Sequence, residues 1–405
     1  MKKYKTKVLI NKDMNTFIKI VTVLLFLPVS LFAQNNVDKV LSQIEKNNTT
    51  LSALRKSADA QKIGNKTGVF LKNPEVEFNY LWGNPSLIGN RTDFSVRQSF
   101  DFPTAYGYKK QISDIKNAQA ELEYRKQQKT ILLQARNICI NLTYCNALKS
   151  EYGKRLNHAQ SIARSNKLKF DAGDVNVLEY NKSQLNLLNL SYKIELLEID
   201  RTAMLSELNR LNGGVDIELT ESEIQSQIIP TDFDKWYTQA EQSNPILNWL
   251  KQEIEISRKQ VSLNKSLSLP KIQAGYMSES VVGEQFRGIS VGLSIPLWEN
   301  KNTVKYAKAN AVALEAVAAD SKVQLYNQLK SLHSKAISLQ NNLTEYRSKL
   351  QSLNSSDLLK KALDKGEISL IDYIMELSIY YESVNKLLEL ERDMNMAVGE
   401  LNQYL

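Results

Sequence analysis

Apolar and polar positions recur with two different periods along this chain. From about Thr104 to Phe170 the apolar or small positions follow a three-four spacing, and proline is absent. A period of 3.5 residues is typical of a coiled-coil seam, which is narrower than the buried face of a globular helix. The spacing predicts one helix over 104–170, about 100 Å long. The seam residues are Ala135, Ile138, Leu142, Cys145, Tyr152, Leu156, Ala159 and Ala163.

The same period returns over 176–212 and predicts a shorter helix there. A second long stretch without proline predicts a helix over 303–364, and a last helix is expected over 369–405, after Gly366. Two more helical patterns run from about 37 to 66 and from 233 to 266. Because these helices have narrow apolar stripes, we expect them to pack along one another.

Four segments alternate with a period of two and predict two β-hairpins, over 75–102 and 271–297. The clearest alternation lies in Gly288–Leu297, where one face is aliphatic and the other is small or polar. This pattern over about ten residues is typical of a transmembrane β-strand, although a strand on a soluble core would show it too. The aliphatic face holds Ile289, Val291, Leu293, Ile295 and Leu297.

A transmembrane reading of these strands requires several copies of the chain. A sheet in lipid must close on itself so that every backbone group is hydrogen-bonded. Four strands cannot close, because the smallest common barrels have about eight. Three copies of the chain would supply twelve strands.

One phrase occurs twice. FDAGDVNVLEY at 170–180 is similar to LDKGEISLIDY at 363–373, and an acid follows six residues after each glycine. Each phrase lies where a long helix is expected to end and a shorter one to begin. The chain therefore reads as a tandem repeat of helix, hairpin, long helix and short helix. The first repeat spans 34–214, the second spans 231–405, and 215–230 form a linker.

The N-terminus predicts a secretory signal peptide over 1–33. Lys19 precedes the apolar run Ile20–Phe32, and Ala33 offers a cleavage site. A transmembrane anchor is the alternative, but the run is short for a bilayer span. No cysteine follows Ala33, so a lipid anchor is not expected there.

Charge and chemistry narrow the function. The net charge is +8, of which the first nineteen residues supply +5 through six lysines and one aspartate. The remainder gives no footprint for nucleic acid. Cys139 and Cys145 are too far apart along a helix for a disulfide, and His158 and His333 have no ligand spacing around them. We find no catalytic constellation and expect no enzyme activity, no cofactor and no metal site.

The repeated plan, the signal peptide and the Gly-x5-acid phrases resemble the TolC-type outer-membrane efflux proteins. The strand exits SIPLW and FDFPTAYGYKK are also similar to those of the family. The resemblance covers the chain from about Gln34 to Leu405. The C-terminus ends with the last expected helix, as in the heavy-metal-efflux-like branch of the family.

The resemblance implies a fold that is mostly α with transmembrane β, and a homotrimer. Its twelve-stranded β-barrel would lie in outer-membrane lipid, and an α-helical coiled-coil tunnel would cross the periplasm. The implied function is a passive export duct in a tripartite efflux or secretion system. The implied partners are a periplasmic adaptor and an inner-membrane pump, such as a resistance-nodulation-division transporter.

The resemblance also implies the site. It places Gly173, Asp174, Gly366 and Glu367 at turns of the helical hairpins, at the periplasmic tip. Glu179 and Asp372 would lie near the pore constriction, where three copies of each would form a ring that attracts cations. Helix capping is the alternative role for these acids. The family often has a second acid three residues further on, but here those positions are Lys182 and Met375.

Two other functions stay open at this point. A periplasmic adaptor also carries a long helical hairpin, but it would need many more short strands than this sequence shows. A structural coiled-coil protein of the envelope would not need four amphipathic strands.

Overall fold

The computed structural model describes residues 36–223 and 228–403. The chain divides into two units, Met1–Val40 and Leu41–Leu405. The described part of the first unit, 36–40, is the beginning of helix α2. The expected signal peptide, 1–33, lies outside the described residues.

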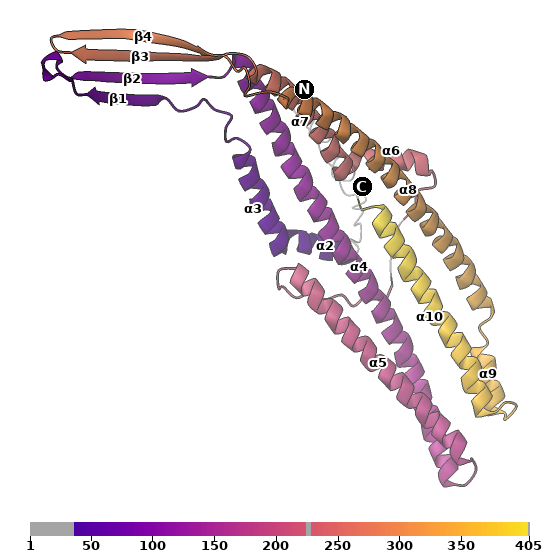
Figure 1. Cartoon of the computed structure of the whole chain (residues 1–405). Coiled ribbons are helices and arrows are strands. Elements are labelled where there is room, and N and C mark those ends of the chain that lie inside the picture. Colours follow the sequence, from indigo (N-terminus) through magenta and orange to yellow (C-terminus); the bar gives the residue numbers. More distant parts are fainter. Residues whose placement is uncertain (1–35, 224–227, 404–405) are drawn as a thin grey trace, which may run out of the picture. The chain divides into compact units, whose positions relative to one another are not determined.

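Helices form most of the described chain, and all four strands belong to one sheet (Figure 1). Among the described residues, no helix is long and apolar enough to cross a bilayer. The elements in order are α2 Asn36–Asn47, α3 Thr49–Gly64, β1 Glu75–Leu81, the 3-10 helix η1 Ser86–Ile88, β2 Arg91–Phe100, α4 Pro103–Asp171, α5 Val177–Leu211, α6 Phe233–Ser243, α7 Pro245–Leu267, β3 Lys271–Val281, β4 Glu284–Ser294, α8 Thr303–Ser352, α9 Ser356–Asp364 and α10 Leu370–Leu401.

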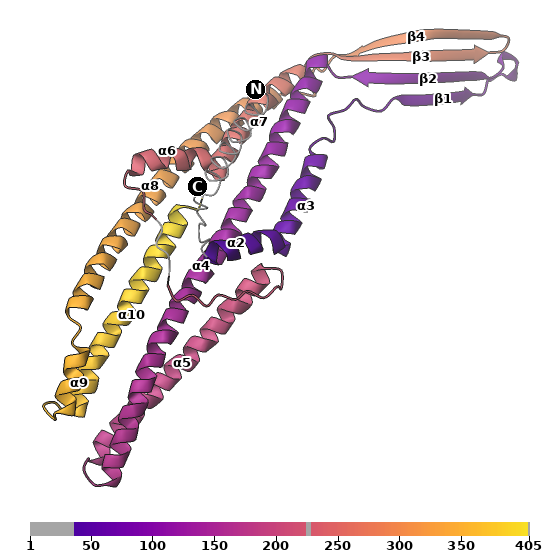
Figure 2. The ribbon, with the colours of Figure 1, turned by 180° about the vertical axis from the view of Figure 1, so that it is seen from behind.

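The longest helix, α4, joins the sheet to the first helical turn. It has 69 residues, which corresponds to about 100 Å. Two residues separate it from β2, and it ends at the turn that contains Gly173. The length of α4 therefore separates the sheet from this turn within the second unit, as both views show (Figure 2).

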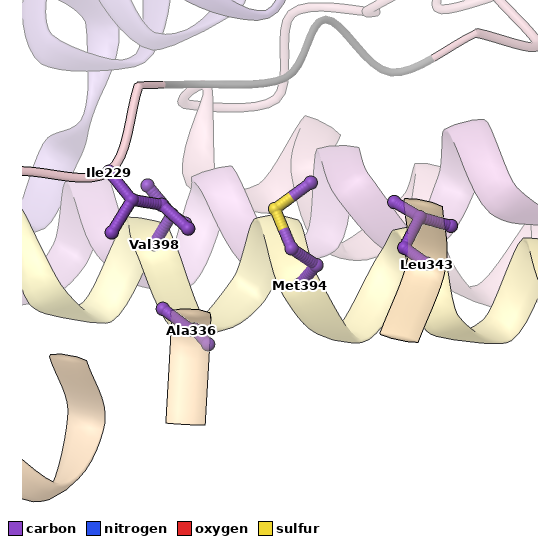
Figure 3. Packing of buried hydrophobic residues seen from close by; sticks show 6 residues of the cluster. Ile229, Ala336, Leu343, Met394 and Val398 are labelled. Carbon is purple, nitrogen blue, oxygen red and sulfur yellow. The ribbon is translucent and has the colours of Figure 1, made fainter. Parts of the chain in front are cut away.

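The helices of the second unit pack mainly in antiparallel pairs. Helix α4 packs against α5, α7 and α10, and α8 packs against α7 and α10. A cluster of buried residues joins α8 to α10 and covers part of the segment before α6 (Figure 3). In it, Met394 and Val398 of α10 lie beside Ala336 and Leu343 of α8, with Ile229 against them. The seam predicted for α4 is also buried, since Cys145 of α4 lies in a cluster with Leu197 of α5.

Three helices expected to be continuous are interrupted, and each break has a local cause. The helix expected over 37–66 is divided at Asn48, whose side chain accepts a 2.7 Å hydrogen bond from the Leu51 amide. The helix expected over 233–266 is divided at Asn244, because Pro245 follows it and disfavours a helical backbone there. In both cases the asparagine caps the next helix.

The long helix expected over 303–364 is also wrong in its continuity. It is divided into α8 and α9 around Asn354. The Asn354 carboxamide oxygen accepts hydrogen bonds from the amide and the hydroxyl of Ser356, at 3.2 and 2.7 Å. Short polar side chains of this type offer the backbone an alternative to helical hydrogen bonds.

The sheet is antiparallel with strand order β1-β2-β3-β4. Its register pairs Val76 with Val96, Val96 with Tyr276, and Tyr276 with Ile289. Directly paired residues lie on the same face of a sheet. The register therefore gathers the apolar positions of all four strands on one face.

Candidate functional site

The turns after α4 and α9 have the same backbone geometry. Gly173 and Gly366 have φ angles of +83° and +74°. The Asp174 amide donates to the Lys169 carbonyl at 2.8 Å, and the Glu367 amide donates to the Ala362 carbonyl at 2.9 Å. This is the Schellman arrangement, in which glycine supplies the left-handed residue. A Cβ at either glycine would meet nothing within 4 Å, so the φ angle alone requires glycine.

The acid six residues after each glycine occupies the third position of the next helix. The Glu179 amide donates to the Asn176 side chain at 3.0 Å. The Asp372 amide donates to the Ser369 hydroxyl at 3.1 Å, and that hydroxyl donates to the Asp372 carboxylate at 2.6 Å. Ser369 therefore caps α10, and the Asp372 carboxylate accepts from the capping hydroxyl, which supports a role at the helix N-terminus for this residue. Asp174 and Glu367 are exposed at the turns.

A groove of about 520 Å³ brings the two turn regions together. Its lining includes Glu179 from the first turn region and Gly366 from the second, together with His158, Lys360 and Tyr373. Glu179 is half-buried there, whereas Asp372 is exposed and does not line this groove. Glu179 and Asp372 hold equivalent positions in the two repeated sequence phrases, but their surroundings in the chain differ.

A buried polar cluster lies between α4 and α10 and shares His158 and Tyr373 with this groove. Arg155 is only 3% exposed and donates from Nη1 to the Asn385 carboxamide oxygen at 2.9 Å. The His158 Nε2 atom lies 3.0 Å from the Tyr373 hydroxyl, and Nδ1 lies 3.5 Å from the Tyr381 hydroxyl. These residues come from α4 and α10, which are far apart in the sequence, as their colours in Figure 1 show.

Burial changes the proton affinity of this cluster. It raises the pKa of Tyr373 to about 12 and lowers the pKa of His158, to which the nearby Lys360 charge also contributes. It also lowers the pKa of Arg155, whose guanidinium lies 4.4 Å from the ring centre of Tyr381. The cluster therefore consists of a buried cation, a neutral imidazole and two protonated phenols at neutral pH.

Sequence reasoning missed this cluster. The available signal was the spacing on α10, where Tyr373, Tyr381 and Asn385 follow one another at multiples of four residues and so share a face. Arg155 and His158 are three apart on α4. What the sequence did not show is that these two faces meet, because the pairing of α4 with α10 is a tertiary contact.

The sheet supplies a different candidate surface. Ile289, Val291 and Leu293 of β4 are 85%, 74% and 67% exposed, and Val76 and Phe78 of β1 are 66% and 65% exposed. Within the described residues no helix packs extensively against the sheet. The opposite face is polar and carries cross-strand ion pairs such as Arg97–Glu77. An apolar face of this extent on a soluble protein marks an interaction surface.

Metal-binding sites and reactive thiols find little support in the described part of the chain. No cluster of three or more His, Cys, Asp or Glu side chains with metal-binding geometry occurs among the described residues. Cys139 and Cys145 are free thiols and are buried, which raises their pKa values to about 12 and about 11.

Solved structures with the same fold include outer-membrane channels. The CmeC outer membrane channel of Campylobacter jejuni matches with a TM-score of 0.75 at 15% identity, over 91% of this chain and 85% of that one. A structure of CusC, whose title describes transmembrane channel formation, matches with a TM-score of 0.75 at 14% identity, over 91% of both chains. The outer membrane protein VceC of Vibrio cholerae matches with a TM-score of 0.72 at 11% identity, over 91% of this chain and 94% of that one.

The likeness lies in the fold, and the sequences have diverged. No protein-family model matches the chain, and no curated protein sequence matches it at a significant level. The fold is that of solved outer-membrane channels, so the resemblance predicted from the sequence is confirmed at the level of the fold.

Proposed function

From this shared fold, we propose that the protein is the outer-membrane channel of a tripartite efflux or secretion system. The observation that carries the proposal is the uncovered apolar face of the sheet, joined through α4 to a long bundle of helices. In such a channel the apolar face of the sheet would contact lipid. The long helices would form the wall of a tunnel. The protein would lie in the outer membrane and extend into the periplasm.

The sheet favours an assembly of several copies. It is a single layer with two edges, β1 and β4. Unpaired strand edges are unfavourable in lipid, because their backbone groups have no hydrogen-bond partners. Pairing β4 of one copy with β1 of the next removes both edges. Three copies then give a closed barrel of twelve strands with the apolar face outward, and the helices form the tunnel wall of a homotrimer.

The proposed partners are the other two components of such a system. A periplasmic adaptor engages the helical turns, and an inner-membrane pump, such as a resistance-nodulation-division transporter, supplies the energy. The channel itself is passive and is not an enzyme. The solved structures that share this fold are titled as channels or membrane proteins.

We further propose that the chain is a tandem duplication, 34–214 and 231–405. The matching order of elements on either side of the segment before α6 supports this interpretation. So do the equal hydrogen bonds at Gly173 and Gly366. Both turns would lie at the periplasmic tip, with Asp174 and Glu367 beside them.

Particle shape tests the assembly. The protein is extracted from outer membranes in detergent, and negatively stained images are averaged. We expect a three-fold cylinder longer than 100 Å, which is the length of α4 alone, with a detergent ring at one end. A monomer that stays soluble without detergent would overturn the proposal and would favour the periplasmic adaptor.

Conductance tests the proposed pore acids, Glu179 and Asp372. In a planar bilayer, the variant Glu179→Gln should lower cation selectivity if three copies of Glu179 face the constriction. Asp372→Asn should lower selectivity in the same way and also remove a charge that favours the N-terminus of α10, at a cost of about 0.5 kcal/mol. The control is Glu195→Gln, an exposed acid on α5 away from the turns. Unchanged selectivity in both test variants would limit these acids to capping.

A further inference from the structure

Helix α5 carries two apolar seams, and only one of them is covered within the chain. The covered seam packs against α4, where Leu197 lies in a buried cluster with Cys145. The opposite side of α5 exposes large apolar side chains at intervals of seven residues, with one more leucine between them. We call these residues the outer seam; they are Leu178, Leu185, Leu188, Tyr192 and Ile199, which are 71%, 56%, 62%, 59% and 64% exposed.

The outer seam lies at a free edge of the helical layer. Helix α4 packs against α5 and α10, and α10 packs against α8, so the order is α5, α4, α10, α8 (Figure 1). Helices α5 and α8 are therefore the two edges of this layer, and no described helix packs on the outer side of either one. An exposed apolar stripe with a seven-residue period is typical of a coiled-coil seam that lacks its partner helix.

The opposite edge exposes two leucines where its helix is interrupted. Leu353 directly follows α8 and Leu358 lies in α9, and they are 73% and 66% exposed. They lie on either side of the break at Asn354. Helix α4, which precedes the other glycine turn, has no such break. The break is therefore a feature of one edge only.

The two exposed surfaces lie at the same level along the helices. Three hydrogen bonds between neighbouring helices fix the levels; they join Lys149 to Glu198, Arg155 to Asn385 and Arg347 to Glu391, at 2.6, 2.9 and 3.1 Å. Counting residues from these pairs along the antiparallel helices places Leu353 level with Tyr192, to within about one helical turn. Leu358 then lies near the level of Leu188.

The sheet and the helical layer have their free edges on the same two flanks of the chain. Strand β4 leads directly to α8. Helix α3 leads to β1, and Asn48 before α3 donates to the Leu211 carbonyl at the end of α5, at 2.7 Å. Pairing β4 of one copy with β1 of the next therefore brings α8 and α9 of the first copy to α5 of the second.

We propose that the outer seam of α5 binds the α8–α9 break of a second copy of this chain, with Leu188 and Tyr192 against Leu353 and Leu358. This contact rests on the proposed function, because the order of the copies comes from the closed sheet. It gives the break at Asn354 a role in assembly, since the break carries both leucines.

Disulfide formation tests the contact in the full-length protein in outer membranes. Leu188→Cys and Leu353→Cys are combined in one chain, and Tyr192→Cys replaces Leu188→Cys in a second pair. Because α4 and α10 separate α5 from α8 within a chain, the disulfide can form only between copies. After oxidation we expect at least one pair to give a ladder on non-reducing gels that ends at three copies. The mismatched control is Leu178→Cys with Leu353→Cys, which should not react, because Leu178 lies about 20 Å along α5 from Tyr192.

Particle shape separates a failure of this contact from a failure of the proposed function. Three-fold particles without a disulfide in either pair would overturn the α5 contact alone. Monomers would overturn the proposed function as well. A disulfide from Leu188→Cys alone would mean that two α5 edges meet, and a disulfide to a different protein would mean that another partner covers the seam. Either result would overturn the contact with the α8–α9 break.

A charge on the outer seam gives a second test. Leu188→Glu should lower the ratio of trimer to monomer in detergent about tenfold or more, because each copy would lose a buried leucine and bury a carboxylate. The matched control is Leu168→Glu on α4, a leucine that is 66% exposed on a helix that is not an edge of the layer. Its ratio should equal that of the wild type. Both leucines are exposed within the chain, so both variants should fold. Equal effects of the two variants would overturn the proposal.

Discussion

At the scale of single residues, several ion pairs join neighbouring helices. The clearest case is Glu121 of α4, which accepts hydrogen bonds from Arg55 at 2.7 Å and from Lys62 at 2.9 Å, both on α3. These two hydrogen bonds lower the pKa of Glu121 to about 2. The same carboxylate thus holds α3 against α4, and its charge state links their packing to pH.

The first prediction concerns Glu121→Gln. Since the folded-state pKa is below the ordinary value of 4.5, the carboxylate stabilises the fold above about pH 4.5 and loses this effect as pH falls through about 2. We expect a loss of about 1 kcal/mol at pH 7, because the groups are partly exposed to solvent. Denaturant unfolding at pH 7 and at pH 3 measures it. The control is Glu123→Gln, whose partners lie on its own helix. An equal loss at both pH values would show that the charge is not the cause.

The second prediction concerns the two thiols. Burial raises the pKa values of Cys139 and Cys145, so thiolate is scarce and access is poor. We expect a maleimide to react with the native protein far more slowly than with the protein in denaturant, as followed by mass spectrometry. An added cysteine at the exposed position Ser161 should react rapidly in the native state. Rapid labelling of Cys139 without denaturant would mean that α4 separates from its neighbours.

At the scale of elements, the two turns depend on backbone geometry more than on packing. Our third prediction is that Gly173→Ala and Gly366→Ala each destabilise their turn by about 1–2 kcal/mol, because alanine disfavours a positive φ. Hydrogen exchange at the Asp174 and Glu367 amides should become faster. Gly153→Ala in the middle of α4 is the matched control. It has open space around it and should stabilise the helix by about 1 kcal/mol. Slower exchange at the turns would contradict the argument.

Elements with a single repeated period could be predicted from the sequence, and their interruptions could not. Helix α4 covers the residues in which the three-four spacing was read, because its seam continues without proline. The breaks at Asn48 and Asn354 contain no glycine or proline, and each depends on one asparagine side chain that hydrogen-bonds the next helix. Asparagine is common within helices, so its type alone does not predict a break.

Of the candidate site, only the features set by neighbouring residues in the sequence could be predicted. The glycine turns follow from the sequence phrase, since a left-handed residue is what a helix end requires. The Arg155 cluster depends on contact between residues 230 positions apart, Arg155 and Asn385. No spacing along the chain encodes that contact. The capping role of Asp372 was an alternative from the outset, and the geometry at Ser369 supports it.

At the scale of the whole molecule, the sheet and the helices have opposite requirements. The helices bury their seams within the chain, as at Met394 and Val398, whereas the apolar face of the sheet is exposed and no described helix packs extensively against the sheet. A chain that buries one apolar surface and leaves another exposed is expected to place the second against lipid or another protein. The amphipathic strands predicted this surface, but the number of copies that close the sheet is a property of the assembly.

The fourth prediction separates the two faces of the sheet. Ile289 and Ser290 are adjacent in the middle of β4 and lie on opposite faces. If the apolar face meets lipid, Ile289→Lys should destabilise the membrane-inserted form by about 2–4 kcal/mol, whereas Ser290→Lys, which would face the lumen, should be tolerated. Membrane fractionation and heat resistance of the assembled oligomer on gels measure both variants. If the two lysines had equal effects, lipid would not lie against the Ile289 face. If only Ser290→Lys were harmful, the sheet would be reversed and the polar ion pairs, including Arg97–Glu77, would face outward, which the cost of charge in lipid makes unfavourable.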